Sequence, residues 1–117
     1  MSITTPTTEN TQTGNYTAVL ADENQEVFFN LPGSSGSVVF VFTIPKNADV
    51  SFPIGTVIWV TAELAVNSGY GVSSLMIAGD TGVTVRGRTT VATGGAFVKG
   101  NGGALVVKEA TDTWIAV

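Results

Sequence analysis

Residues 37–44, SVVFVFTI, give the clearest indication of the fold. Their side chains fall into two alternating sets, which an extended chain directs to opposite faces of a sheet. One set is Val38, Phe40, Phe42 and Ile44, and the other is Val39, Val41 and Thr43. Because both sets are largely apolar, we expect a central strand that is covered on both faces.

The rest of the chain favours strands as well. Val, Ile and Thr account for 40 of the 117 residues, and these β-branched side chains suit a pleated sheet better than a helix. No window shows a convincing helical period, and 14 glycines interrupt the chain at short intervals. The pattern predicts an all-β protein, either a single compact β-sandwich that is jelly-roll-like or a small barrel.

Alternation and turn residues place the individual strands. We expect strands over residues 16–20, 26–30, 37–44, 55–65, 72–78, 83–86, 96–99, 104–109 and 113–117. Two turns have the composition of tight hairpins, GDTG at residues 79–82 and Asn101-Gly102. Phe52 is expected to anchor the loop over residues 45–53 in the core. In the strand at 55–65, the inward set is Ile58, Val60, Ala62 and Leu64.

The N-terminal segment differs from the rest in composition. Residues 1–14 hold six threonines, and their only apolar side chains are Met1 and Ile3. Such a segment cannot bury itself, so we expect an extended, flexible Thr-rich arm that orders on a partner. The β-sandwich domain is then expected over residues 15–117, since a chain of about this length forms one domain.

The missing residue types exclude several functions. Without cysteine there is no disulfide, thiolate nucleophile or cysteine zinc site. Without histidine there is no Ser-His-Asp machinery and no imidazole ligand. No pair of carboxylates stands out as the acid and base of a glycosidase. We therefore expect no catalytic residue, no metal and no cofactor, and we do not expect an enzyme.

The charge balance bears on the partners of the protein. Nine acids and five scattered bases give a net charge of −4, which disfavours nucleic acid because phosphates are held by clustered Lys and Arg. The longest apolar run has five residues, from Val38 to Phe42, whereas a membrane-spanning helix needs about 20. Only 12% of the residues are charged, which favours a surface that is partly covered by copies or partners.

The acidic residues Asp22, Glu23 and Glu26 form the densest charged cluster. Carboxylates in one turn can bind calcium, but the spacing of a calcium-binding loop is absent. The simplest interpretation is a solvent-exposed polar turn.

Four residues of the expected domain are candidates for partner contacts. Trp59 falls on the outward face of its strand with Thr61 and Glu63, where it could form a subunit contact, stack on a sugar or be covered by a further layer of the protein. Tyr70 lies in a Gly-flanked turn. Arg86 and Arg88 point the same way if their strand continues, and could meet acids of a neighbouring subunit.

Several stretches resemble a module found in structural proteins of tailed bacteriophages. They are YTAVLAD at residues 16–22, TIPKN at 43–47, VSFPIGTVI at 50–58, MIAG at 76–79, GVTV at 82–85, LVVK at 105–108 and DTWI at 112–115. The resemblance implies a virion protein with a compact β module, usually in oligomers, and it supplies no catalytic residues.

The resemblance and the composition together lead to one expectation about function. We expect a non-enzymatic capsid decoration, or cement, protein on the virion surface. It would bind the outside of the major capsid protein shell of the same virion as an oligomer, with a homotrimer preferred. The arm would fasten it through Ile3, Thr4, Thr5, Pro6, Thr7 and Thr8. The alternative is a tail-fibre or receptor-binding module that recognises host-surface glycans through Trp59 and Tyr70.

Overall fold

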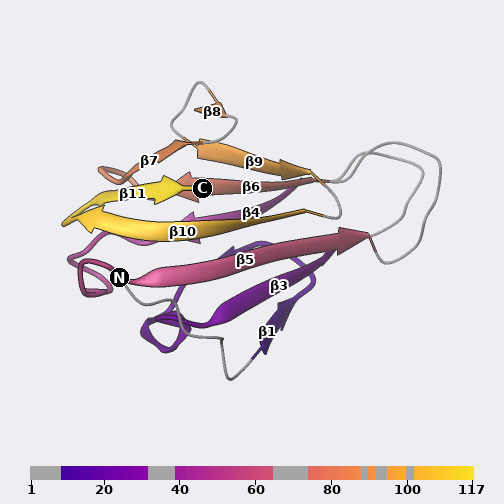
Figure 1. Ribbon diagram of the computed structural model, residues 1–117, viewed down its shortest axis with the longest axis horizontal. Helices are drawn as coiled ribbons and strands as arrows, with labels where there is room; N and C mark the ends of the chain where they lie inside the picture. The colour runs from indigo at the N-terminus through magenta and orange to yellow at the C-terminus, as the bar shows by residue number, and fades with distance from the viewer. Residues whose placement is uncertain (1–8, 32–38, 65–73, 88–89, 92–94, 100–101) are drawn as a thin grey trace.

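The stretches rich in β-branched residues form strands in the computed structural model, shown in Figure 1. The structure describes residues 9–31, 39–64, 74–87, 90–91, 95–99 and 102–117. Within these residues the chain is nearly all β, with eleven strands and one 3-10 helix, η1 (Leu20–Asp22). The expected all-β class is confirmed.

The strands form two sheets, which both mix parallel and antiparallel pairs. The six-stranded sheet has the order β1 (Glu9–Gln12), β3 (Glu26–Leu31), β5 (Val57–Leu64), β10 (Gly102–Ala110), β11 (Thr113–Ala116) and β7 (Thr84–Gly87). The five-stranded sheet has the order β2 (Tyr16–Thr17), β4 (Val39–Ile44), β6 (Ser74–Gly79), β9 (Gly95–Lys99) and β8 (Thr90–Val91).

The path of the chain explains why many neighbouring strands are parallel. From β1 to β7, each strand lies in the other sheet from the one before it. Parallel strands need a long crossover, and here the crossover is the intervening strand of the opposite sheet. As a result β1, β3 and β5 are parallel to one another, and so are β2, β4 and β6. A jelly roll is antiparallel, so this pairing does not confirm that part of the prediction.

Both expected hairpins are wrong. β6 and β7 flank the turn at residues 79–82 but lie in different sheets, and so do β9 and β10 on either side of Asn101-Gly102. The turn at residues 79–82 does reverse the chain, since the Val83 N–H donates to the Asp80 carbonyl at 2.9 Å and Gly82 has a positive φ. Gly79 is required because a Cβ there would lie 2.5 Å from the carbonyl oxygen of Val83. The turn therefore carries the chain across to the opposite sheet instead of pairing its flanks.

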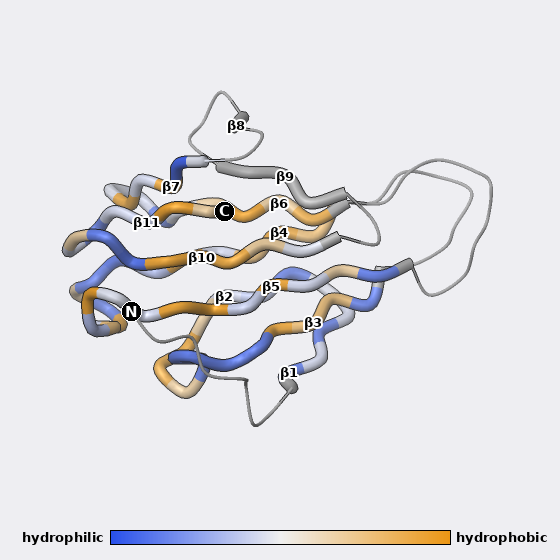
Figure 2. Tube along the Cα trace, viewed as in Figure 1, coloured by the Kyte–Doolittle hydropathy of each residue, from blue (hydrophilic) through white to orange (hydrophobic). Residues whose placement is uncertain are grey.

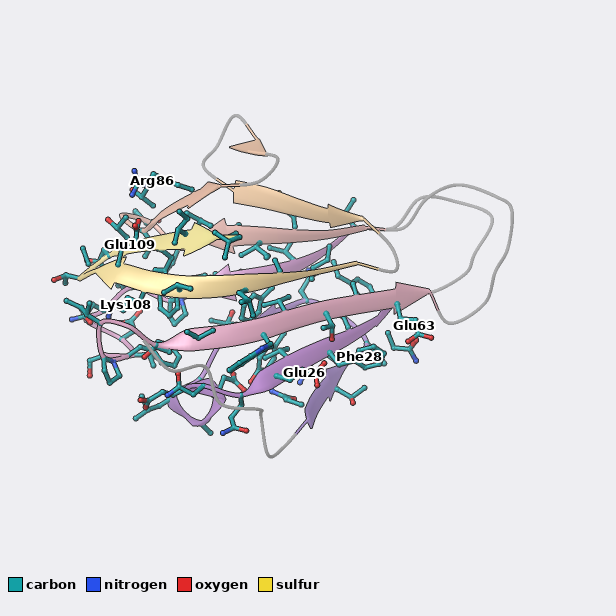
Figure 3. All side chains as sticks on the ribbon, in the orientation of Figure 1. Glu26, Phe28, Glu63, Arg86, Lys108 and Glu109 are labelled. Atoms are coloured by element: carbon teal, nitrogen blue, oxygen red, sulfur yellow. The ribbon has the colours of Figure 1, made fainter. Side chains whose placement is uncertain are left out.

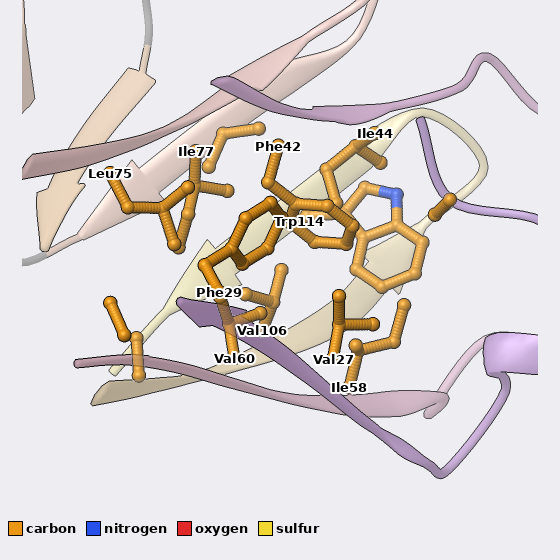
Figure 4. Close-up of a cluster of buried hydrophobic side chains, with 14 of the residues drawn as sticks. Val27, Phe29, Phe42, Ile44, Ile58, Val60, Leu75, Ile77, Val106 and Trp114 are labelled. Atoms are coloured by element: carbon orange, nitrogen blue, oxygen red, sulfur yellow. The ribbon is translucent and has the colours of Figure 1, made fainter. Parts of the chain in front are cut away.

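The inward faces of the two sheets share one hydrophobic core, shown in Figure 4. Its largest fully buried side chains are Trp114, Phe29, Phe42, Ile44, Ile58, Leu75, Ile77, Val27, Val60, Val85 and Val106. The predicted inward positions Ile58, Val60 and Ala62 are confirmed, while the side chain of Leu64 lies outside the described set. Phe52 is buried as expected, with its ring edge-on to Trp114 at a centroid distance of 5.6 Å.

One face of β4 is open, which corrects the expectation of two covered faces. Phe42 and Ile44 are fully buried, but Val39 on the other face is 46% exposed and Val41 is only partly buried. The apolar character of both faces therefore reflects the core on one side and an exposed outer surface on the other.

Part of the segment expected as an arm is a strand. Glu9–Gln12 pair in parallel with β3 at the edge of the six-stranded sheet. Residues 1–8 lie outside the described part of the chain.

Replacement of Trp114 tests the shared core. We expect Trp114→Ala to lower the free energy of unfolding by about 3–5 kcal/mol, because it leaves a large cavity. Val117→Ala should change it by less than about 0.5 kcal/mol, since Val117 is 55% exposed. Urea unfolding of the two variants checks this, and equal losses would contradict the assignment of the core.

Candidate interaction face

Trp59 lies on the outer face of the six-stranded sheet. Its neighbours in β5, Ile58 and Val60, are fully buried in the core, so alternation directs the indole away from the core. The ring is partly exposed. Within the described part of the chain no second layer encloses Trp59. The structure therefore does not support the interpretation that a further layer of the protein covers this side chain, and Trp59 faces outward.

Register brings further apolar side chains beside Trp59. Leu105 of β10 is directly opposite Trp59, and the backbone of Leu105 exchanges hydrogen bonds of 3.0 and 2.9 Å with Val117. On the next row Val107 is opposite Ile115. We call these five residues the outer patch. Val117 is exposed and the other four are partly buried, so the patch presents apolar surface on β5, β10 and the C-terminal strand.

Charged side chains lie at the margins of the outer patch. Arg86 forms an ion pair with Glu109 at 2.5 Å, and both side chains are exposed. Glu26 accepts a hydrogen bond of 2.8 Å from the Thr61 hydroxyl, and Glu63 is exposed. Figure 3 shows Arg86 and Glu109 on one side of the molecule, Glu63 on the opposite side at the end of β5, and Glu26 between them. The hydropathy colouring of Figure 2 likewise shows apolar stretches within β3 and β10, with hydrophilic residues at the start of β3 and toward the C-terminal end of β10.

The structure brings together two of the sequence-predicted contact residues. Trp59 and Arg86 share the outer face, with β10 and β11 between their strands. Arg86 forms an ion pair with Glu109 of its own chain. The predicted contact between Arg86 and acidic residues of a neighbouring subunit would have to form beside this ion pair or replace it. Tyr70, Arg88 and the arm residues Ile3–Thr8 lie outside the described residues.

Sequence reasoning missed most of the outer patch. Residues 104–107 are all apolar, so alternation alone does not tell which of them face outward. The pairing of β10 with β5 settles this, because Ala104 and Val106 join the core and leave Leu105 and Val107 outside. The sequence did indicate that Trp59 faces outward. Its neighbours on the adjacent strand could not be assigned, because that requires the register between β5 and β10.

The acidic cluster is not a solvent-exposed turn, because Asp22 is only 3% exposed. Its carboxylate accepts hydrogen bonds from the Asn10 amide at 3.0 Å, the Tyr16 hydroxyl at 2.7 Å and the Val19 backbone N–H at 2.9 Å. Asn10 also donates to the Tyr16 oxygen at 2.8 Å. We call Asn10, Tyr16 and Asp22 the polar clasp. It fastens β1 to β2 and η1, which explains why an acidic residue is buried here.

Burial in the polar clasp raises the pKa of Tyr16 to about 12. Desolvation is the main cause, followed by the hydrogen bond to Asp22 and the negative charge of that carboxylate, while the Asn10 hydrogen bond acts in the opposite direction. The clasp therefore keeps Tyr16 protonated at alkaline pH values where a tyrosine with the ordinary pKa of 10.0 loses its proton.

No group of three or more Asp and Glu side chains that could hold a metal ion occurs within the described ranges. No helix in that part of the chain is long and apolar enough to cross a membrane.

Comparison of the chain with protein-family models, curated protein sequences and solved structures finds no match.

The polar clasp predicts a specific loss of stability in alkali. The folded pKa of Tyr16, about 12, lies above the ordinary value of 10.0, so the folded protein keeps a proton that the unfolded chain loses. The stabilising contribution is complete below pH 10, and it falls as the pH rises toward 12. Urea unfolding of the wild type and Tyr16→Phe across this range should show the difference between them shrinking. A constant difference would contradict the prediction.

Proposed function

We propose that the protein is a non-enzymatic capsid decoration protein of a tailed bacteriophage. It binds the outside of the major capsid protein shell as an oligomer, preferably a homotrimer, and stabilises the shell. The observation that carries this proposal is the outer patch. Its apolar side chains lie on regular strands, and its margins carry charged groups, which is the arrangement of a protein–protein contact.

The composition of the outer patch supports a macromolecular partner. Partly exposed Trp59 is paired across strands with Leu105, and large aromatic side chains are the residues that anchor interfaces most often. Partly exposed apolar side chains that share one outer face of a sheet favour a contact role. A rigid sheet also presents the patch without the entropy loss of ordering a loop.

The fold supports a structural role as well. We infer that the two sheets form a β-sandwich, because their inward faces meet in one core. Such a module contains no thiol that oxidation could damage. β1, which follows the proposed clamp residues Ile3–Thr8 in the sequence, is an edge strand of the six-stranded sheet.

A glycan-binding tail-fibre module is the second candidate. The partly exposed Trp59 favours it, since an indole face can stack on a sugar ring. Glu26 lies in register with Trp59 on β3, so one carboxylate stands beside the ring. Against this candidate, the other neighbours of Trp59 in the outer patch are aliphatic, whereas a sugar needs several convergent polar groups. A glycan array distinguishes the candidates, because binding that is abolished by Trp59→Ala would favour the fibre module.

The copy number of the protein per virion tests the main proposal. Quantitative mass spectrometry of purified particles should give a value in the same range as the major shell protein. A copy number typical of a tail appendage, or absence from the particle, would contradict a decoration role.

A charge placed in the outer patch should disrupt assembly without unfolding the protein. We expect Leu105→Lys to weaken self-association or shell binding by more than about tenfold, since a central interface residue typically contributes about 2 kcal/mol. Val41→Lys is the matched control, because Val41 is also partly buried but lies on the outer face of the other sheet. Light scattering and capsid co-sedimentation measure both variants, and equal effects would contradict the assignment of the interface to this face.

Removal of residues 1–8 tests the arm. We expect the truncated protein to fold with unchanged stability, because β1 and the polar clasp begin after the deletion. Its retention on capsids should fall at least tenfold if the lost contacts are worth about 1.4 kcal/mol or more. Co-sedimentation at graded protein concentration measures this, and unchanged retention would show that the arm is not the clamp.

A further inference from the structure

Lys108 occupies an unusual position for a lysine. It lies on the inward phase of β10, opposite Trp114, and is only 2% exposed. Its Nζ donates to the Asn47 side-chain oxygen Oδ1 at 2.6 Å and to the Phe52 carbonyl at 2.7 Å. Both acceptors are neutral, and the one ion pair within the described ranges joins Arg86 to Glu109. Lysine is almost never fully buried without a charged partner, so this arrangement calls for an explanation.

The two side chains are held in place from several segments. The backbone N–H of Asn47 donates to the Asp112 carboxylate at 2.8 Å, and the Lys46 carbonyl accepts from Asp49 and Val50. Both backbone groups of Lys108 are bonded to the loop before β5. Its N–H donates to the Thr56 carbonyl, and its carbonyl accepts from the Gly55 N–H. The Lys108 Nζ and the Asn47 side-chain amide are therefore held next to each other. Holding two reacting groups in place in this way lowers the activation free energy of a reaction between them.

We propose that Lys108 and Asn47 are joined by an intramolecular isopeptide bond. As the Lys108 ammonium gives up one proton, the freed Nζ lone pair attacks Cγ of Asn47 and the Nζ–Cγ bond forms. The Cγ–Nδ2 bond breaks as Nδ2 takes up that proton and a second one from Nζ. The Lys108 ammonium group and the Asn47 carboxamide become one secondary amide and one ammonium ion, so that two protons of the lysine leave on Nδ2. No oxidant, cofactor or second protein is required.

The surroundings favour the amide over the separate groups. An isolated buried ammonium is unfavourable because it has lost its water, and the reaction replaces it with a neutral amide. The new amide N–H can still donate to the Phe52 carbonyl. Lys108, Phe52 and Trp114 are all nearly fully buried, whereas Asn47 is partly exposed. Asp112 acts as a positioning residue through the Asn47 backbone.

The mass of the purified full-length protein tests the proposal. After allowance for the initiator methionine, it should be lower than the sequence mass by one molecule of ammonia. Trypsin cleaves after Lys46, Arg86 and Lys99 but not after an acylated Lys108. The digest should therefore contain residues 47–86 linked to residues 100–117. An intact protein at the full sequence mass, with free peptides 100–108 and 109–117, would overturn the proposal.

Two matched variants identify the origin of any mass loss. Lys108→Arg keeps a cation that can donate to the same oxygens but does not form this amide, so it should have its full sequence mass. Lys46→Arg changes an exposed lysine next to Asn47 and should keep the loss. A succinimide at Asn101-Gly102 also releases ammonia, but that loss would persist in Lys108→Arg and leave the peptides unlinked. That result would overturn the proposal.

Discussion

The structure depends on one constraint, which is that the strands from β2 to β7 bury their inward side chains against the opposite sheet while pairing with strands that are not their neighbours in sequence. β3 and β5 illustrate it, since they pair in parallel although β4 of the other sheet lies between them in the chain. From β1 to β7 each connection must therefore cross the thickness of the core, about 10 Å. The close approach of Gly79 to Val83 is one consequence, because the turn there leaves one sheet for the other.

The inward residues were predictable from the sequence, but their partners were not. Ile58, Val60 and Ala62 are assigned correctly because alternation is a local property of an extended chain. The hairpins were wrong because a turn sequence sets a reversal without choosing the sheet that the next strand joins. That choice depends on which faces can be buried together, and this information is distributed over the whole chain.

The candidate site was predictable to a similar extent. Trp59 was correctly placed on an outward face, whereas Leu105 and Val107 needed the register between β5 and β10. The burial of Asp22 was missed for a related reason. Its partner Asn10 is twelve residues away, in a segment whose polar composition gives no sign that it forms an edge strand. The composition of a segment indicates only how much apolar surface it can bury. β1 is held instead by its backbone pairing with β3 and by the polar clasp, and neither of these depends on apolar side chains.

β10 carries residues of both proposals. One of its faces belongs to the proposed interaction face, and the other carries the proposed isopeptide bond. Leu105 and Val107 point outward to the outer patch, and Lys108 points inward to Asn47. A slip of one residue would exchange these faces. An isopeptide bond at Lys108 would prevent that slip. It would also link two residues that are 61 positions apart. A disulfide that closes a loop of this length contributes about 4 kcal/mol to the free energy of unfolding. A chain without cysteine could in this way fix covalently the strand that carries its interaction face.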